Sequence, residues 1–275
     1  MSSTPPESPP QVTVRTLLRM KEEGRAIVCL TAYDALFGRL LDESDVDVIL
    51  VGDSLGQVVC GFDSTIPVTL DAMIHHASAV RRGVSRALLV VDMPFLTFQV
   101  SPADTIRNAG RVMQETGAQA VKLEGGGVAV VEHIRALVEA GIPVMGHLGL
   151  TPQSVHALGG YRVQGRGEED AARIRAEAAA LEDAGCFSVV LELLPRALAG
   201  EVTRALEIPT IGIGAGPDVD GQVLVLHDML GLNEGFEPKF LRRFGRLGEA
   251  ARAAVTAYAQ AVRSGEYPED QHSFD

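Results

Sequence analysis

Three carboxylates in this 275-residue chain each stand at or near the end of a short apolar run. They are Asp53 in VDVILVGD, Asp92 in ALLVVDMP and Glu124 in AQAVKLEG. If the three runs are parallel strands of one sheet, their carboxylates meet at one rim of that sheet. Mg²⁺ prefers such hard oxygen ligands and leaves its other positions to water or substrate. The pattern therefore predicts a divalent metal site, with Mg²⁺ as the expected cofactor.

A lysine, a histidine and a fourth carboxylate extend this set. Lys122 and Glu124 lie two residues apart in one run, so they point to the same face of a strand. His147 in GHLG and Glu192 in VVLELLP stand in the next two apolar runs. Aliphatic neighbours flank Glu192, and a desolvated carboxylate can act as a general base near neutral pH. Glu192 is thus the candidate base.

A metal, a lysine and a base suit the removal of a proton beside the carbonyl of a 2-oxo acid. The metal would stabilise the resulting enolate as a Lewis acid. Lys122 would add a second positive contact to the substrate carboxylate. The enolate then needs a carbon electrophile.

Each of these residues also has a purely structural interpretation. Asp53 could cap a following helix. Lys122 could simply neutralise Glu124, and His147 could be a core histidine with its hydrogen bonds satisfied. Glu192 could pair with an arginine or with the histidine. The residue types alone leave these alternatives open.

Eight short apolar runs supply the elements that would position these groups. They cover residues 26–33, 46–53, 87–94, 118–125, 142–149, 187–194, 208–216 and 222–228. Because the runs are continuous rather than alternating, they indicate strands covered on both faces. Helical patterns lie between most of them, at 34–45, 69–83, 103–117 and 168–185. Eight such alternations predict an α/β fold, a single-domain (β/α)₈ TIM barrel with its chemistry at the carboxyl ends of the strands.

The two ends of the chain differ from the barrel pattern. We expect a flexible tail over residues 1–13, the barrel with C-terminal helices over 14–265 and an irregular tail over 266–275. An Ala- and Arg-rich helical region opens at Pro238. It could close the barrel, pack on its base or bind another subunit.

The composition disfavours some classes of binding partner and suggests the cellular compartment. A net charge of -12 disfavours nucleic acid and anionic membranes, which recruit Lys and Arg. The segment MSSTPPESPP has no signal-peptide pattern, and no apolar run reaches the length of about 18–20 residues of a spanning helix. The three cysteines, Cys29, Cys60 and Cys186, lack metal-ligand spacing. We expect a cytoplasmic enzyme acting on small molecules.

Five long strings carry a resemblance to a known family. They are VGDSLG, DSTIPVTLDAMIHH, VKLEGG, GHLGLTPQSVHALGGYRVQGRG and IGIGAGPDVDGQVLVLHD. The chain resembles the ketopantoate hydroxymethyltransferase family of pantothenate synthesis from about residue 14 to its end. The resemblance implies a (β/α)₈ barrel that moves a hydroxymethyl unit from 5,10-methylenetetrahydrofolate to 3-methyl-2-oxobutanoate, giving 2-dehydropantoate. It also implies a homo-oligomer, commonly a decamer.

The resemblance also implies roles for single residues. In the family, the positions of Asp53, Asp92 and Glu124 are associated with Mg²⁺. The substrate-binding positions are Asp53, Ser54, Asp92 and Lys122. Glu192 matches the proton acceptor, and His147 is a possible accessory residue. The sequence differs from the usual family pattern at few positions. Leu123 stands where the family commonly has Ile, and the segment VVCGFDST differs from the usual family sequence.

Two rival interpretations remain at this stage. A carbon–carbon lyase or a phosphoenolpyruvate mutase-like enzyme would share the barrel, the metal and the enolate. Such enzymes usually carry a cysteine in a KKCGH-like loop, which is absent here. A non-catalytic barrel acting as a scaffold is disfavoured because three acids, Lys122 and Glu192 occur together.

The segment 159–167, GGYRVQGRG, follows the fifth apolar run. Its glycines and charges predict a mobile cover over the pocket, with Arg162 or Arg166 meeting an anionic ligand group. The alternative is a solvated connection or a subunit contact.

Overall fold

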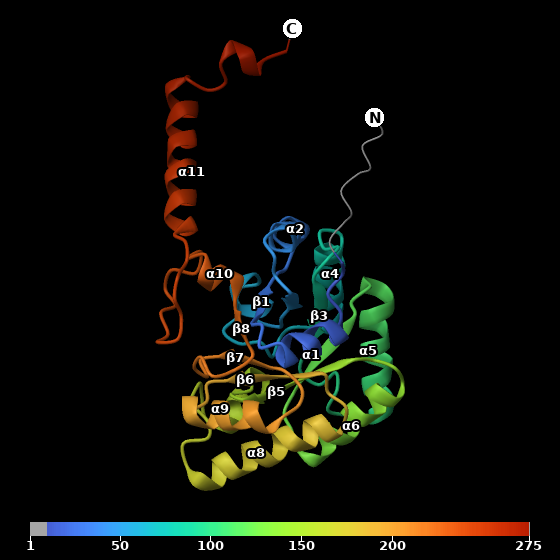
Figure 1. Ribbon diagram of the computed structural model, residues 1–275. Helices are drawn as coiled ribbons and strands as arrows, with labels where there is room; N and C mark the ends of the chain where they lie inside the picture. The colour runs from blue at the N-terminus through green and yellow to red at the C-terminus, as the bar shows by residue number, and fades with distance from the viewer. Residues whose placement is uncertain (1–9, 275) are drawn as a thin grey trace, which may run out of the picture. The chain divides into compact units, whose positions relative to one another are not determined.

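A closed barrel of eight parallel strands forms the centre of the computed structural model, which describes residues 10–274 (Figure 1). The strands follow one another in chain order, and β1 pairs with β8 to close the barrel. They are β1 (Ile27–Thr31), β2 (Val48–Val51), β3 (Leu88–Asp92), β4 (Ala120–Glu124), β5 (Val144–Gly149), β6 (Ser188–Glu192), β7 (Thr210–Ile213) and β8 (Gly221–Leu224). The predicted (β/α)₈ barrel is confirmed, and each of the eight apolar runs contains a strand or most of one.

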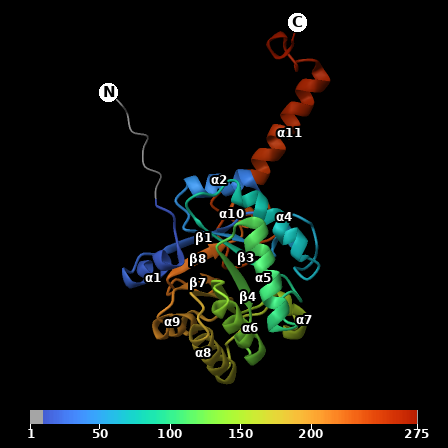
Figure 2. The ribbon, with the colours of Figure 1, turned by 90° about the vertical axis from the view of Figure 1, so that its right-hand side faces the viewer.

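Helices follow the strands and surround the barrel (Figure 2). They are α1 (Val14–Glu22), α2 (Ala35–Glu43), α3 (Leu55–Val58), α4 (Leu70–Arg81), α5 (Pro102–Thr116), α6 (Val128–Glu139), α7 (Val155–Leu158), α8 (Glu168–Asp183) and α9 (Arg196–Ala205). A short 3₁₀ helix, η1 (Pro152–Ser154), precedes α7. The four predicted helical patterns correspond to α2, α4, α5 and α8. Local signals explain α5, since the Ser101 side chain caps its first turn and Gly117, with φ of 72°, ends it.

The described residues from Leu226 on form a second compact unit, and the first unit ends at Val225. It contains α10 (Leu226–Met229), α11 (Leu247–Ser264) and the 3₁₀ helix η2 (Asp270–His272). The helix expected to open at Pro238 begins only at Leu247. Before it, the Arg243 guanidinium donates to the backbone carbonyls of Asn233, Glu234 and Phe236, which fixes an irregular loop. The sequence did not predict a boundary at Val225.

The predicted N-terminal tail overlaps only partly with the described chain. Residues 1–9 lie outside the described residues. Val12 is buried and its N–H donates to the carbonyl of Arg86, while the Thr13 side chain caps α1. Val12 and Thr13 therefore already belong to the folded unit, although the expected tail includes them. No helix within residues 10–274 is long and apolar enough to cross a membrane.

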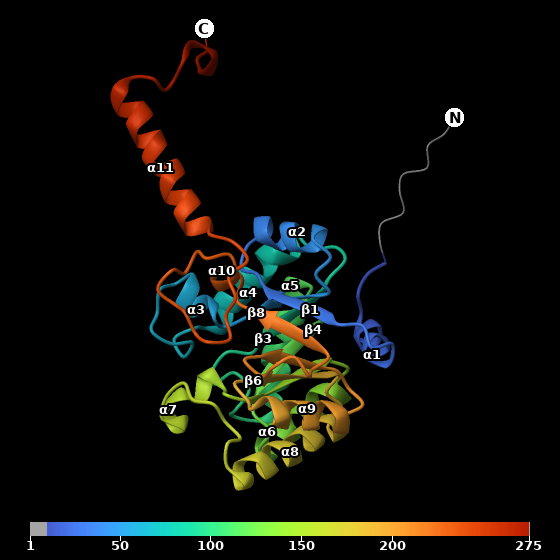
Figure 3. The same cartoon turned by 60° about the vertical axis from the view of Figure 1, so that its left-hand side comes forward.

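Helix α1 packs against the side chains that fill the barrel interior. Leu17 and Met20 of this helix are almost completely buried in one cluster with residues of the strands. The strand residues of the cluster are Ile27, Cys29, Val48, Leu50, Leu88, Val90, Ala120, Met145, Val190, Ile211 and Val223. Figure 3 shows α1 on one side of the barrel, with α3 and α7 on the other. The barrel is thus a filled core with one end covered by α1.

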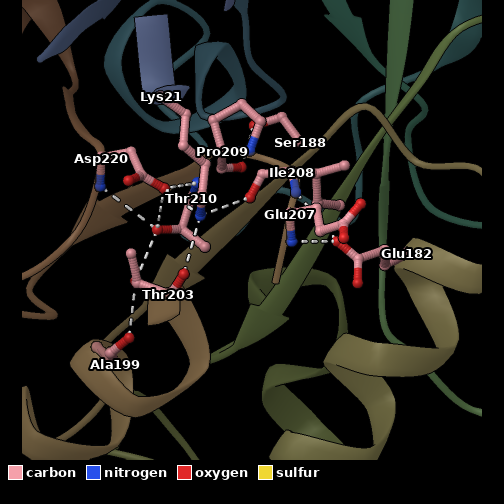
Figure 4. Close-up of polar contacts among 10 residues, drawn as sticks. All are labelled: Lys21, Glu182, Ser188, Ala199, Thr203, Glu207, Ile208, Pro209, Thr210 and Asp220. Atoms are coloured by element: carbon pink, nitrogen blue, oxygen red, sulfur yellow. Dashed lines mark hydrogen bonds and ion pairs between the residues drawn. The ribbon is translucent and has the colours of Figure 1, made fainter. Parts of the chain in front are cut away.

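A lysine on α1 fastens this helix to the barrel (Figure 4). The Lys21 ammonium donates to the carbonyls of Thr203 and Ile208 at 2.8 and 3.0 Å and to Asp220 Oδ2 at 3.0 Å. The same carboxylate oxygen accepts the N–H of Thr210 at 2.8 Å. Lys21 and Asp220 are largely buried, so each satisfies a charge that water reaches poorly.

We predict that Lys21→Met lowers the free energy of unfolding by about 2–3 kcal/mol, because it leaves a largely buried carboxylate without its cation. Urea unfolding followed by circular dichroism measures the loss. The control is Arg19→Met on the same helix, whose pair with Glu23 is mostly exposed and is expected to contribute less than about 0.5 kcal/mol. Equal effects of the two substitutions would contradict the anchoring role of Lys21.

Candidate active site

The predicted chemical residues gather at the carboxyl end of the barrel. Asp53 follows β2, and the others lie on the strands themselves: Asp92 on β3, Lys122 and Glu124 on β4, His147 on β5 and Glu192 on β6. The strand register sets Asp92 opposite Lys122 and Glu124 opposite His147. All six are buried except Glu192, whose side chain is 17% exposed. The polar groups thus form one buried patch with Glu192 at its margin.

Lys122 lies among the carboxylates of this patch. Its Nζ is 3.0 Å from Asp92 Oδ1 and 3.1 Å from His147 Nδ1. Burial alone lowers the pKa of Lys122, but the charges of Asp92, Glu124 and Asp53 outweigh it and leave that pKa raised. Lys122 is therefore held as a cation, so it can contact an anionic substrate group.

Asp53 and Asp92 are close neighbours with incompletely balanced charge. The N–H of Asp53 donates to Asp92 Oδ2 at 3.0 Å. Burial raises the pKa of Asp53 well above its usual range, and the negative charges of Asp92 and Glu124 raise it further. Burial also raises the pKa of Asp92, although Lys122 opposes this shift. Lys122 therefore neutralises only part of the negative charge that these carboxylates carry when ionised.

Glu124, His147 and Glu192 form a second chain of contacts. Glu124 Oε1 lies 3.5 Å from His147 Nδ1, and His147 Nε2 lies 3.2 Å from Glu192 Oε2. Burial and the charge of Lys122 lower the pKa of His147, yet the contacts with the two glutamates prevail and raise it. The imidazole therefore links a fully buried carboxylate to one that solvent reaches.

The backbone around Glu192 is closely constrained. A Cβ added to Gly149, which has φ of 94°, would lie 2.1 Å from the carbonyl oxygen of Glu192. The next residue, Leu193, has φ of 46°, a left-handed conformation that costs a non-glycine residue about 1–2 kcal/mol. Its N–H donates to Ile213 O, and its carbonyl accepts from the N–H of Gln164. Neighbouring strands and loops thus hold the turn that carries Glu192.

The residues fit a divalent metal by chemistry and charge. The carboxylates of Asp53, Asp92 and Glu124 all act on Lys122, and Asp92 Oδ1 has the ion pair with Lys122 at 3.0 Å but no hydrogen bond. A divalent cation would compensate this charge. Within residues 10–274, no group of three or more His, Cys, Asp or Glu side chains is already arranged to hold a metal ion. The metal assignment therefore rests on the type and charge of these residues.

Ser54 contacts a residue that sequence reasoning missed. Its Oγ lies 2.9 Å from the hydroxyl of Tyr33, which follows β1 and is buried. His76 Nδ1 lies 2.7 Å from the carbonyl oxygen of Tyr33 and helps to fix that residue. Tyr33 stands in the run AIVCLTAY, at a strand end equivalent to those of the carboxylates. That position was the signal that could have found it.

A tyrosine of the loop over residues 159–167, Tyr161, contacts helix α3 and is 52% exposed. Tyr161 Oη lies 3.4 Å from Gln57 Nε2. The pKa of Tyr161 is raised by burial, and the charges of Glu192 and Asp53 add to this shift. Arg162 and Arg166 are exposed. The predicted contact of these arginines with an anionic ligand stays a prediction.

Comparison with known proteins identifies the family. A sequence model described as ketopantoate hydroxymethyltransferase matches residues 11–270. The chain belongs to this family. A relative from Moorella thermoacetica named 3-methyl-2-oxobutanoate hydroxymethyltransferase is 56% identical over 96% of this chain and 98% of its own length. One of the same name from Pelobacter propionicus is 55% identical over 96% and 98%. The chain is thus a hydroxymethyltransferase of the pantothenate pathway.

The barrel itself is shared more widely. A solved structure of 2,3-dimethylmalate lyase, a member of the phosphoenolpyruvate mutase/isocitrate lyase superfamily, superposes with a TM-score of 0.60. It is 18% identical and covers 97% of this chain and 93% of its own. At this identity the likeness shows the fold alone. The lyase or mutase alternative therefore gains no support, whereas the family match favours the hydroxymethyltransferase.

The excess buried charge predicts an unusual pH dependence of stability in metal-free protein. A carboxyl group whose pKa is raised on folding stabilises the protein below its unfolded pKa, and this stabilisation is lost as pH rises through the folded pKa. We expect Asp53→Asn to increase the free energy of unfolding near neutral pH and to reduce its fall with rising pH. Denaturant unfolding at a series of pH values in excess chelator measures both.

Asp42 provides a control of opposite sign. It is partly buried, which opposes ionisation, but the backbone N–H groups of Ser85, Arg86 and Ala87 prevail and lower its pKa. Its stabilisation is present above the unfolded pKa and is lost as pH falls. Asp42→Asn should therefore destabilise at neutral pH, with a smaller difference in acid. A change of the same sign in both variants would contradict the charge argument for Asp53.

Proposed function

We propose that this hydroxymethyltransferase moves a one-carbon unit from 5,10-methylenetetrahydrofolate to 3-methyl-2-oxobutanoate by way of an enolate, giving 2-dehydropantoate. The names of the relatives support the acceptor. The observation that carries the mechanism is a partly exposed carboxylate, Glu192, next to a buried cationic and acidic patch. Such a patch can bind an anionic 2-oxo acid while a base at its margin takes a proton from the adjacent carbon.

In this proposal the patch orients the 2-oxo acid. Lys122, held as a cation, contacts the substrate carboxylate. The other proposed substrate-binding residues are Asp53, Ser54 and Asp92. Mg²⁺ would be held by Asp53, Asp92 and Glu124. When bound, it supplies Lewis-acid stabilisation of negative charge on the 2-oxo oxygen. The burial of the patch excludes water, which strengthens these electrostatic contacts.

Glu192 is the proposed base. It takes the C3 proton, and the electron pair of the C–H bond moves toward the 2-oxo group. His147 Nε2 lies 3.2 Å from Glu192 Oε2 without a hydrogen bond between them, close enough for a protonated imidazole to attract this carboxylate. The enolate carbon then bonds to the one-carbon unit of 5,10-methylenetetrahydrofolate, and the bonds from that unit to the two folate nitrogens break. Water supplies the hydroxyl oxygen and the protons that yield tetrahydrofolate, and the proton held by Glu192 returns to the new hydroxymethyl group. His147 would serve as an accessory residue rather than the base.

The setting of the enzyme is also part of the proposal. We infer a cytoplasmic enzyme with small-molecule substrates and neither a nucleic acid nor a membrane as partner. A homo-oligomer, such as the decamer implied by the family, is expected. Multi-angle light scattering measures the oligomeric mass directly, and a monomer at micromolar concentration would overturn this part.

We predict that Glu192→Gln lowers the rate of proton abstraction by about 10²- to 10⁴-fold, because glutamine keeps the shape of the side chain but takes up no proton at neutral pH. Exchange of the C3 hydrogen of 3-methyl-2-oxobutanoate in heavy water without folate isolates this step. Affinity for the 2-oxo acid is expected to change little. The control is Glu201→Gln on α9, an exposed glutamate that pairs with Arg175. Exchange at the parent rate in Glu192→Gln would make His147 the next candidate.

The metal proposal predicts loss of turnover on removal of divalent ions and recovery with Mg²⁺ or Mn²⁺. The assay follows folate-dependent formation of 2-dehydropantoate after chelation, with the metal content of the protein measured alongside. Full activity in protein shown to be metal-free would overturn the metal role. Cleavage of a 2-oxo acid without any folate-dependent product would instead favour the lyase alternative.

A further inference from the structure

One buried amide joins the carboxylates of the candidate site. Gln153 is the middle residue of η1, directly after β5, and is 5% exposed. Its residue type and position in the string GHLGLTPQS do not by themselves mark it as a site residue. A buried side-chain amide needs a partner for each N–H and for its oxygen, because unpaired polar groups are costly there.

The contacts of Gln153 determine how its amide is oriented. Nε2 donates to Asp53 Oδ2 and to the carbonyl of Met93, both at 2.9 Å. Oε1 accepts from Gln99 Nε2 at 3.3 Å. A rotated amide would place its oxygen against a carboxylate and a carbonyl, which are both acceptors. The network therefore selects the orientation in which Gln153 donates to Asp53.

The backbone of the same residue binds a second carboxylate. The N–H of Gln153 donates to Glu124 Oε2 at 3.0 Å. Asp53 and Glu124 come from different strand ends, and Gln153 is separated from them by 100 and 29 residues in sequence. One rigid turn thus holds an oxygen of each carboxylate and leaves the other oxygens of both for different partners.

We propose that Gln153 is a positioning residue that sets the placement of Asp53 and Glu124 toward a divalent cation. This inference rests on the metal site of the proposed function. Partners that hold the ligands of a metal restrict their orientation, and their loss typically lowers metal affinity or activity about 10- to 100-fold. Gln153 fits this role because it donates to both carboxylates.

A purely structural role is the competing explanation, since Gln153 also binds the loop after β3. It reaches that loop through the carbonyl of Met93 and through Gln99. If anchoring of the loop were its whole contribution, Gln99→Met should affect metal binding as much as a change at Gln153. If positioning of the carboxylates matters, Gln153 should have the larger effect, because Gln99 touches neither Asp53 nor Glu124 in the network above.

The test measures Mn²⁺ affinity by electron paramagnetic resonance, without substrate or turnover. Gln153→Met removes the donation to Asp53, keeps the backbone N–H for Glu124 and preserves the side-chain length. We expect its Kd for Mn²⁺ to rise about 10- to 100-fold, with a smaller rise for Gln99→Met. Gln119→Met is the matched control, since Gln119 accepts the N–H of Leu89 at the opposite end of the strands. It should lower thermal stability and leave Mn²⁺ affinity unchanged.

The outcomes distinguish failure of the positioning role of Gln153 from failure of the proposed metal site. If the parent protein binds Mn²⁺ and Gln153→Met binds it equally well, the positioning role is wrong while the metal site stands. An equal rise in Kd for Gln99→Met and Gln153→Met would also overturn it. If the parent protein binds no Mn²⁺, the proposed metal site fails and this inference fails with it. Gln153→Asn, whose shorter amide does not reach Asp53, provides the same comparison if the methionine variant does not fold.

Discussion

Burial of several carboxylates around Lys122 is the constraint on which the candidate site depends. The charges of Asp92, Glu124 and Asp53 keep this lysine protonated against the effect of burial. Burial raises the pKa values of Asp53 and Asp92, and Lys122 opposes only part of this shift. A site in this state gains free energy from any ligand that brings positive charge or shares protons with it. Chemistry that needs a cation and a base together follows from this imbalance.

Such an arrangement is unfavourable for folding, so the rest of the barrel must supply the stability. The strands below the site are filled by aliphatic side chains, and Leu17 and Met20 of α1 complete that cluster. At this end the charges are matched: Lys21 meets Asp220 and two carbonyls. The two ends of the barrel therefore differ in how well their buried charges are balanced. Satisfied polar contacts at one end provide stability, and unbalanced charge at the other provides function.

Much of the fold and part of the site could be predicted from the sequence. Continuous apolar runs mark the strands of such a barrel, so all eight strands were found, and the carboxylates at their ends followed from strand direction. The expected burial on both faces fails for β1 and β8, in which alternate residues are exposed or half-buried. Contacts made by loops could not be predicted in this way. Gln153 meets Asp53 across 100 residues, and Tyr161 meets Gln57 across 104. No local period encodes such contacts. The start of α11 was also missed, because Pro238 is a typical helix-start signal.

The shared barrel shows why side chains, rather than the fold, must carry the functional argument. A protein with 18% identity, 2,3-dimethylmalate lyase, has a similar chain path over almost the whole length. The strand ends of such a barrel are fixed in space, so exchanging the groups on them changes the reaction without changing the core. Here β4 places Lys122 and Glu124 on one face, and η1 brings Gln153 to two of the carboxylates. The short turn after β5 thereby holds carboxylates that follow or end two other strands. A change in such a turn can alter the active site while the strands of the barrel stay the same.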